Sequence, residues 1–198
     1  VLAVYLFSGA SAELAHGLRI RFGSWALTNA LYTLITVFGF ATIMFPLTLY
    51  RDYVIEHRYG LSRQSMESWF LDFLKGLLLE LGLATLFFGV VYAFLRYFPD
   101  HWWLWASCFY ILFAVVLTSV APVLIMPLFH KFEPLDDPRL AESLRVFAEK
   151  EGLRVLGVYR WGLEEKTNTA NAALTGLGRT RRIILGDTML TGYTPDEV

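Results

Sequence analysis

The chain has 198 residues, of which 56% are hydrophobic and only 18% are charged, and its mean hydropathy is +0.47. Soluble domains average about 45–50% apolar and about 25% charged residues, so this composition is typical of a protein that lies in a membrane. The net charge of −1 gives no reason to expect a nucleic-acid partner, and the single cysteine, Cys108, excludes an internal disulfide.

The chain begins with an apolar stretch, Val1–Phe7, which we interpret as the tail of a partial membrane span. It shows no cleavable signal peptide. Residues 8–23 contain four ionisable side chains and are predicted to form a polar connector; these side chains are Glu13, His16, Arg19 and Arg21.

Three later stretches are long enough to cross a bilayer. Residues 24–50 and 102–129 contain no charged side chain, and residues 76–95 contain only Glu80. A helix needs about 20 apolar residues to cross the roughly 30 Å hydrocarbon layer. We therefore predict three full spans, the first ending near Phe45-Pro46, where the proline kinks or terminates the helix.

The segments between these spans indicate how the chain crosses the membrane. In residues 51–75, aromatic residues recur at helical spacing from Trp69 onward, which predicts an amphipathic helix at the interface. The short turn Pro99–His101 makes the second and third spans an antiparallel hairpin. Basic residues are more frequent on the side that holds the C-terminal part, which favours the cytoplasmic side for it; they are Arg51, Arg58, Arg63, Lys75 and Lys131.

From His130 onward the pattern changes to that of a soluble α+β domain. Asp137-Pro138 predicts the start of a helix that Gly152 ends. Three strands are then predicted, namely Leu153–Trp161 and a hairpin formed by Asn171–Gly176 and Arg182–Gly186. Finally, Thr194-Pro195-Asp196-Glu197 has the capping-box pattern of a beginning helix.

Three blocks, in order, resemble the type-I CAAX prenyl endopeptidases, an integral-membrane family of zinc metalloproteases. They are YRDYVIEHRYGLSRQS at 50–65, APVLIMPLFHKFEPL at 121–135 and TANAALTGLGRTRRIILGDTML at 169–190. The third block is the most specific, because in the family this hairpin immediately precedes the helix that carries H-E-x-x-H. The resemblance extends from about Tyr5 onward, with His130 and Ser62 standing where the family often has Asn.

The resemblance implies a fold and a function. Residues 1–129 are expected to form an all-α membrane domain with three full spans and a partial one, and residues 130–198 the start of an α+β zinc-metalloprotease domain. The whole protein is then expected to be a membrane-embedded endopeptidase of the bacterial inner membrane or the endoplasmic reticulum membrane. Its expected partners are the lipid bilayer and a peptide, because it would cleave C-terminal peptides of prenylated or membrane-associated proteins.

The zinc site itself is not in this sequence. H-E-x-x-H needs two imidazoles one helical turn apart, with a glutamate that activates water. The four histidines, His16, His57, His101 and His130, do not have this spacing. We therefore predict no catalytic and no metal-ligating residue here. The chain alone is expected to be inactive, and the zinc helix is expected just beyond Val198.

Asn171 and Ala172 are the candidate substrate-binding residues. The resemblance implies that their strand borders the cleft above the zinc helix, where its backbone pairs with an extended peptide and the Asn171 amide holds a substrate carbonyl. The alternative is that Asn171 only caps a turn before the strand.

Other candidates have simpler interpretations. Glu80 is an intramembrane carboxylate, for which a structural or cavity-lining role is favoured over catalysis. His57 and His130 are expected to be solvated or interfacial, and Glu164-Glu165-Lys166 to form a solvated loop. The basic residues Arg179, Arg181 and Arg182 suit either a solvated hairpin tip or contact with anionic headgroups.

A second hypothesis is a non-catalytic membrane scaffold or a transporter-like protein. Glu80 within a span and the prolines Pro122 and Pro127 in the third span would suit a transport pathway. The sequence shows no internal repeat, however, and a soluble hairpin has no evident role in transport.

Overall fold

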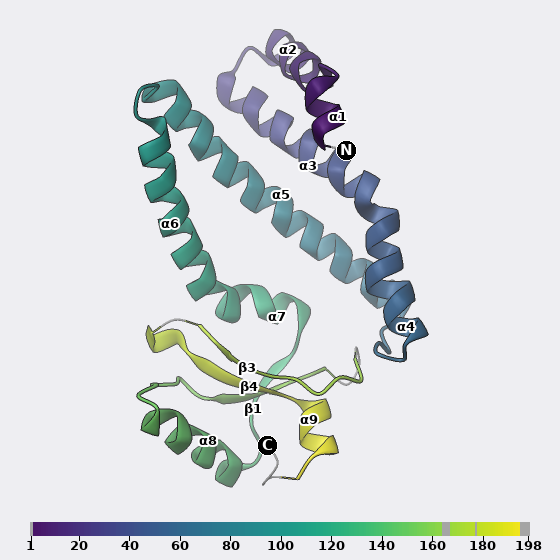
Figure 1. Ribbon diagram of the computed structural model, residues 1–198, viewed down its shortest axis with the longest axis vertical. Helices are drawn as coiled ribbons and strands as arrows, with labels where there is room; N and C mark the ends of the chain where they lie inside the picture. Colours follow the sequence, from purple (N-terminus) through teal and green to yellow (C-terminus); the bar gives the residue numbers. More distant parts are fainter. Residues whose placement is uncertain (1, 164–166, 177, 195–198) are drawn as a thin grey trace. The chain divides into compact units, whose positions relative to one another are not determined.

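The computed structural model describes residues 2–163, 167–176 and 178–194 (Figure 1). Three of its helical segments are long and apolar enough to cross a membrane, namely Trp25–Arg58, Met66–Tyr97 and Trp102–Phe129, with mean hydropathies of 1.8, 2.0 and 2.5. The three predicted spans are thus confirmed as helices that are long and apolar enough to cross a membrane. Many of their large apolar side chains are exposed, such as Leu78 at 70% and Ile111 at 63%, and lipid is the solvent in which such a surface is stable.

One compact unit consists of residues 1–48 and 73–110. It contains α1 (Leu2–Phe7), α2 (Ala10–Phe22), most of α3 (Trp25–Leu49) and most of α5 (Met66–Tyr97). Residues 10–22, which are part of the predicted polar connector, are therefore helical. The residues that decide this are alanines and leucines, which are strong helix formers. The Ser11 and Tyr32 hydroxyls, 2.6 Å apart, join α2 to α3.

Helix α3 does not end at Pro46. It continues through the proline to Leu49 and into a π-helix, η1 (Tyr50–Ile55), and then α4 (Glu56–Arg58). A wider π turn adapts a helix to a missing donor or an extra residue, and spacing patterns do not predict it. The expected separate interfacial helix is also wrong, because Trp69 lies in the first turn of α5, which runs unbroken to Tyr97.

The second compact unit consists of residues 49–72 and 111–198. It includes the last part of α6 (Trp102–Val120), the π-helix η2 (Ala121–Ile125) and α7 (Met126–Phe129). A mixed sheet follows, with strands in the order β1-β2-β4-β3. Its bounds are β1 Phe132–Pro134, β2 Val158–Trp161, β3 Ala172–Thr175 and β4 Arg182–Gly186, together with α8 (Pro138–Lys150), η3 (Gly178–Thr180) and α9 (Asp187–Gly192).

The sheet and α8 share a small apolar core, in which Leu140, Val158 and Leu185 are buried. Asp137 caps α8 as predicted, since its carboxylate accepts from the N–H groups of Arg139 and Leu140. The predicted hairpin is confirmed as β3 and β4, which pair antiparallel. The capping-box residues 195–197 lie outside the described residues.

Two sheet predictions need correction. The strand expected over 153–161 begins only at Val158, because the chain leaves α8 through Gly152 at a φ of +72°, and the Leu153 N–H still bonds to Ala148 in that helix. Strand β1 was not predicted at all. Its three residues pair antiparallel with β2, with Pro134 opposite Tyr159.

Candidate functional site

Strand β3 lies at an edge of the sheet, since β4 is its neighbour on one side and no described strand pairs with the other side. Ala172 lies opposite Leu185, and Leu174 lies opposite Ile183. An edge strand presents a row of backbone N–H and C=O groups that a further strand can bind. The direction of each backbone N–H and C=O group of β3 decides which residues are available to such a strand.

The hydrogen bonds at the start of β3 show which of its residues present backbone groups at the open edge. The Gly186 N–H donates to the Asn171 carbonyl over 2.7 Å, so Asn171 and Gly186 form a hydrogen-bonded pair. Residues of an antiparallel ladder alternate between groups that face the partner strand and groups that face away. Asn171 and Ala173 therefore face β4, whereas Ala172 and Leu174 direct their backbone groups to the open edge.

The structure thus gives the two predicted residues different positions. Asn171 immediately precedes β3 and its carbonyl is used by the sheet, while Ala172 begins the strand with its peptide groups at the open edge. Both residues are exposed. Gly186 allows the close approach here, because a Cβ at that position would lie 2.9 Å from the Asn171 carbonyl oxygen. Substrate binding by Asn171 and Ala172 remains a prediction.

A distant loop holds the segment that leads into β3. The Asn168 side chain donates to the Gly60 carbonyl over 2.7 Å, and its backbone N–H donates to the Leu61 carbonyl over 2.9 Å. The Thr167 hydroxyl donates to the same Leu61 carbonyl over 2.8 Å. Gly60 has a φ of +66°, which favours glycine. We call the loop of residues 59–65 the anchor loop, because it fixes the chain three residues before Asn171.

The anchor loop is itself fixed to α4 and α5. The Nε2 atom of His57 lies 2.9 Å from the Gln64 carbonyl oxygen, and its Nδ1 atom lies 2.8 Å from the Tyr53 carbonyl oxygen. The Gln64 amide donates to Asp72 over 2.7 Å. His57 is therefore a half-buried residue that holds the anchor loop, at the end of the first span, and it is not fully solvated.

Asp187 and its neighbour Thr188 also hold the segment that leads into β3. Asp187 is only 6% exposed, and one carboxylate oxygen accepts from the backbone N–H groups of Leu163 and Thr188, each over 2.9 Å. The Thr188 hydroxyl donates to the Thr169 carbonyl over 2.9 Å. Sequence reasoning missed this residue, although a lone acidic residue that follows the apolar run 183–185 after a single glycine, Gly186, is a signal for a buried cap.

The remaining candidates do not assemble into a site. His130 packs edge-on against the Trp161 ring, with centroids 5.1 Å apart, and the Arg182 guanidinium lies 5.0 Å over the Tyr159 ring as part of β4. Arg182 is thus not at a solvated tip. Glu80 is exposed on α5. Residues 164–166 and the Arg179 side chain lie outside the described part.

The described residues do not fit a zinc site. A catalytic zinc needs three protein ligands of the histidine, cysteine or carboxylate type, and within 2–163, 167–176 and 178–194 no three such side chains come together. What this region provides is a fixed, open strand edge.

Comparison with known proteins agrees with this fold. Residues 1–131 match the family described as CAAX prenyl protease N-terminal, five membrane helices. The crystal structure of S. mikatae Ste24p superimposes with a TM-score of 0.84 at 23% identity, covering 98% of this chain and 47% of that one. At this identity the likeness shows the fold alone.

Curated relatives share more of the sequence. A probable CAAX prenyl protease 1 of Schizosaccharomyces pombe is 30% identical over 175 residues, which are 86% of this chain and 37% of that protein. An uncharacterized metalloprotease of Bacillus subtilis, YhfN, is 27% identical over 192 residues, or 93% of this chain and 45% of that protein. The chain spans less than half the length of these relatives, and it belongs to the CAAX prenyl protease family.

Proposed function

We propose that the complete protein is a membrane-embedded zinc metallo-endopeptidase, and that this chain encloses and aligns the substrate without cleaving it. The open edge of β3 supports the proposal, because it offers a row of backbone groups to a further strand. The anchor loop and Asp187 hold the segment before this strand in place. The names of the relatives support a protease. The proposed substrates are C-terminal peptides of prenylated or membrane-associated proteins.

In this proposal an extended peptide adds to β3 as a further strand. The N–H and C=O groups of Ala172 and Leu174 bind the peptide backbone, and the exposed Asn171 amide binds a substrate carbonyl. The anchor loop and Asp187 keep the edge in place, so that little ordering is required when the peptide binds.

The metal belongs to the proposal for the whole protein. Since the described residues do not fit a zinc site, the ligands would come from elsewhere in the protein, and no chemical step is assigned to residues of this chain. The excess of basic residues beside the C-terminal part supports a cytoplasmic position for it.

Two proline substitutions in the complete protein test the role of β3. Ala172→Pro removes an N–H that faces the open edge, whereas Ala173→Pro removes one that bonds to β4. We expect Ala172→Pro to leave thermal stability nearly unchanged and to lower kcat/KM on a peptide substrate about tenfold or more, the scale of one lost hydrogen bond in a preorganised site. Ala173→Pro should destabilise the sheet.

The wild-type protein supplies the control for the activity itself. Cleavage of the peptide should require bound zinc and should stop when a chelator removes it. A protein that is stable and intact but has no metal-dependent peptidase activity would support the non-catalytic scaffold or transporter instead. Full activity of Ala172→Pro would show that the edge of β3 is not where the peptide binds.

A further inference from the structure

His57 lies between two carbonyl oxygens. Its Nδ1 atom is 2.8 Å from the carbonyl oxygen of Tyr53, one turn earlier in the same helical segment, and its Nε2 atom is 2.9 Å from that of Gln64 in the anchor loop. All three residues belong to the compact unit of residues 49–72 and 111–198. His57 follows the charge-free stretch 24–50, in a part of the segment that contains charged residues, so it lies at the polar end of the first span.

The two contacts determine the protonation state of the imidazole. A carbonyl oxygen only accepts hydrogen bonds, so each ring nitrogen must carry a hydrogen in order to bond to its oxygen. A neutral imidazole has one N–H and one unprotonated nitrogen, whereas the imidazolium cation has two N–H groups. If His57 were neutral, a nitrogen lone pair would face a carbonyl oxygen at 2.8 or 2.9 Å. The two contacts together therefore require the cation.

The surroundings of His57 favour a cation. The Tyr53 ring lies against the imidazole, with centroids 4.1 Å apart and an interplanar angle of 37°, and an aromatic face attracts a positive charge. The Asp72 carboxylate of α5 accepts from the Gln64 side chain over 2.7 Å, so the residue that His57 binds also contacts an anion. The other titratable or charged groups on the adjoining elements are Arg51 and Asp52 on η1, Glu56 and Arg58 on α4, Tyr59 and Arg63 in the anchor loop, and Glu67 and Lys75 on α5.

The contact with Gln64 extends to β3 through the anchor loop. Within this loop, the Gly60 carbonyl accepts from the Asn168 side chain, and Ser62 forms an isolated antiparallel bridge with Thr167. Residues 167 and 168 lead directly into the strand. The position of the loop therefore sets the position of the start of β3.

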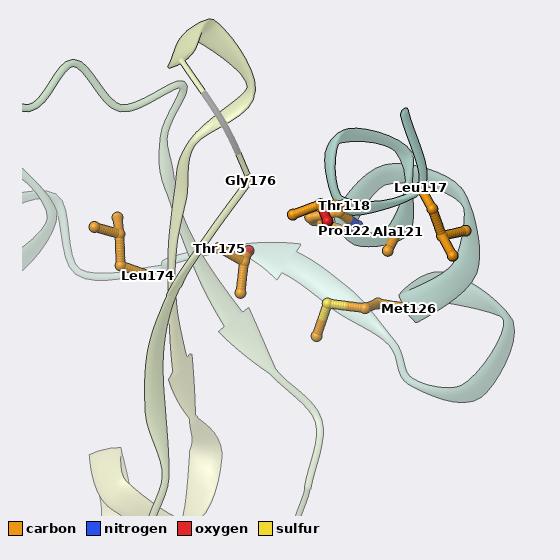
Figure 2. A pocket seen from close by; sticks show the side chains of 8 residues that line it. All are labelled: Leu117, Thr118, Ala121, Pro122, Met126, Leu174, Thr175 and Gly176. Atoms are coloured by element: carbon orange, nitrogen blue, oxygen red, sulfur yellow. The ribbon is translucent and has the colours of Figure 1, made fainter. Parts of the chain in front are cut away.

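The far end of β3 lacks packing on the side of the third span. It borders a cavity of about 500 Å³, and Figure 2 shows Thr175 and Gly176 on one side of this space and Pro122 and Met126 on the other. Among the described residues, the strand is thus fixed by its pairing with β4 and by the contacts at its start. The anchor loop is therefore the contact whose loss would most affect the strand edge.

We propose that His57 is a positioning residue for the peptide-binding edge, because its imidazolium form holds the anchor loop and, through Asn168, the start of β3. In either neutral tautomer one of its two contacts is lost, and the ring no longer joins the helix to the loop. The edge is therefore ordered at low pH and less ordered at high pH, and peptide binding weakens because more ordering is then required. The effect on peptide binding rests on the proposed function, whereas the order of the strand can be measured without a peptide.

Amide hydrogen exchange of the complete protein in nanodiscs tests the proposal. It is measured from about pH 5.5 to about pH 8.5, which spans most of the range in which histidine changes charge, and is corrected for the intrinsic exchange rate at each pH. We expect the protection of residues 60–64 and 167–171 to fall about fivefold or more as the pH rises, the scale of one hydrogen bond. Residues 183–185 of β4 should keep their protection. Constant protection of 60–64 and 167–171 would overturn the proposal.

Two variants that do not titrate separate the contacts of His57. His57→Gln can place an amide N–H near the Nε2 position and keep the contact with Gln64, so its protection should not depend on pH. His57→Asn can place an N–H only near the Nδ1 position and should show the low protection of the wild type at high pH throughout. His101→Gln changes an exposed histidine in the turn between two spans and should keep the wild-type pH dependence. If the pH dependence persists in His57→Gln, another group causes it and the proposal is wrong.

Binding of a non-cleavable peptide links the strand order to function. The peptide has no group that titrates in this pH range. We expect its Kd to rise about fivefold with pH for the wild type and for His101→Gln, and to stay constant for His57→Gln. A Kd that does not change while protection falls would contradict the positioning role. If no peptide binds at any pH, the proposed function fails, and the protection of residues 167–171 alone decides whether His57 positions β3.

Discussion

The membrane spans and the sheet region expose apolar side chains to different solvents. On α6, Val116 is 50% exposed, and on α8, Phe147 is 65% exposed. The spans bury at most 6% of their most apolar windows, so lipid is what keeps their surface favourable. The sheet region instead has a small core around Leu140, Val158 and Leu185 and depends on polar contacts. The exposed fraction of a side chain therefore does not by itself predict the effect of a substitution.

The largest expected effect tests this difference directly. Val116→Lys places a charge near the middle of the third span, where insertion costs about 2.5–3.5 kcal/mol. Phe147→Lys places the same charge at an exposed position of α8, outside the spans, and should change stability by less than about 0.5 kcal/mol. Membrane-inserted yield and thermal stability in detergent measure both. Similar effects at the two positions would mean that the third span is not in lipid.

The next effect concerns the polar contacts of the sheet region. Asp187→Ala leaves the N–H of Leu163 without its buried acceptor, and the loss should be about 1–3 kcal/mol. Asp187→Asn keeps an oxygen at this position and should cost less. Hydrogen exchange of residues 158–163 and 182–186 reports the loss. Asp136→Ala, at a side chain that is 85% exposed, is the control, and an equal loss there would contradict the role of Asp187.

The smallest effect is expected at the anchor loop. Asn168→Ala removes the hydrogen bond to the Gly60 carbonyl, worth about 1 kcal/mol, and loosens the segment before β3. We expect KM for a peptide substrate to rise about fivefold with kcat unchanged. Asn168→Asp keeps the size of the side chain but loses the donor, so it should show the same change. If Asn168→Asp behaves as wild type, the Asn168 amide does not hold the edge.

The sequence predicted those features that depend on local pattern. The absence of charge in residues 24–50 and 102–129 was enough to predict two spans, and one carboxylate in 76–95 did not obscure the third. The strands at 171–176 and 182–186 were predictable because short apolar runs flank a turn rich in glycine and arginine. Ala172 was correctly expected in a strand, but its outward direction became visible only from the Gly186–Asn171 hydrogen bond.

The missed features depend on contacts between distant residues. Asn168 and Gly60 are 108 residues apart, and neither has a neighbour in sequence that indicates the other. The three residues of β1 are too few to form a pattern and become a strand only by pairing with β2. At η1 and η2, residue spacing predicts either a continuous α-helix or a helix that ends at proline, and the structure has a π-helix instead. Tertiary contacts, rather than propensity, determine each of these.

The most direct test of the peptide-binding edge is amide hydrogen exchange in the complete protein with a non-cleavable peptide. Ala172 and Leu174 direct their N–H groups to the open edge, whereas the Ala173 N–H bonds to β4 and serves as an internal reference. We expect the peptide to slow exchange at Ala172 and Leu174 and to leave exchange at Ala173 unchanged. Unchanged exchange at Ala172 and Leu174 under saturating peptide would contradict binding at this edge.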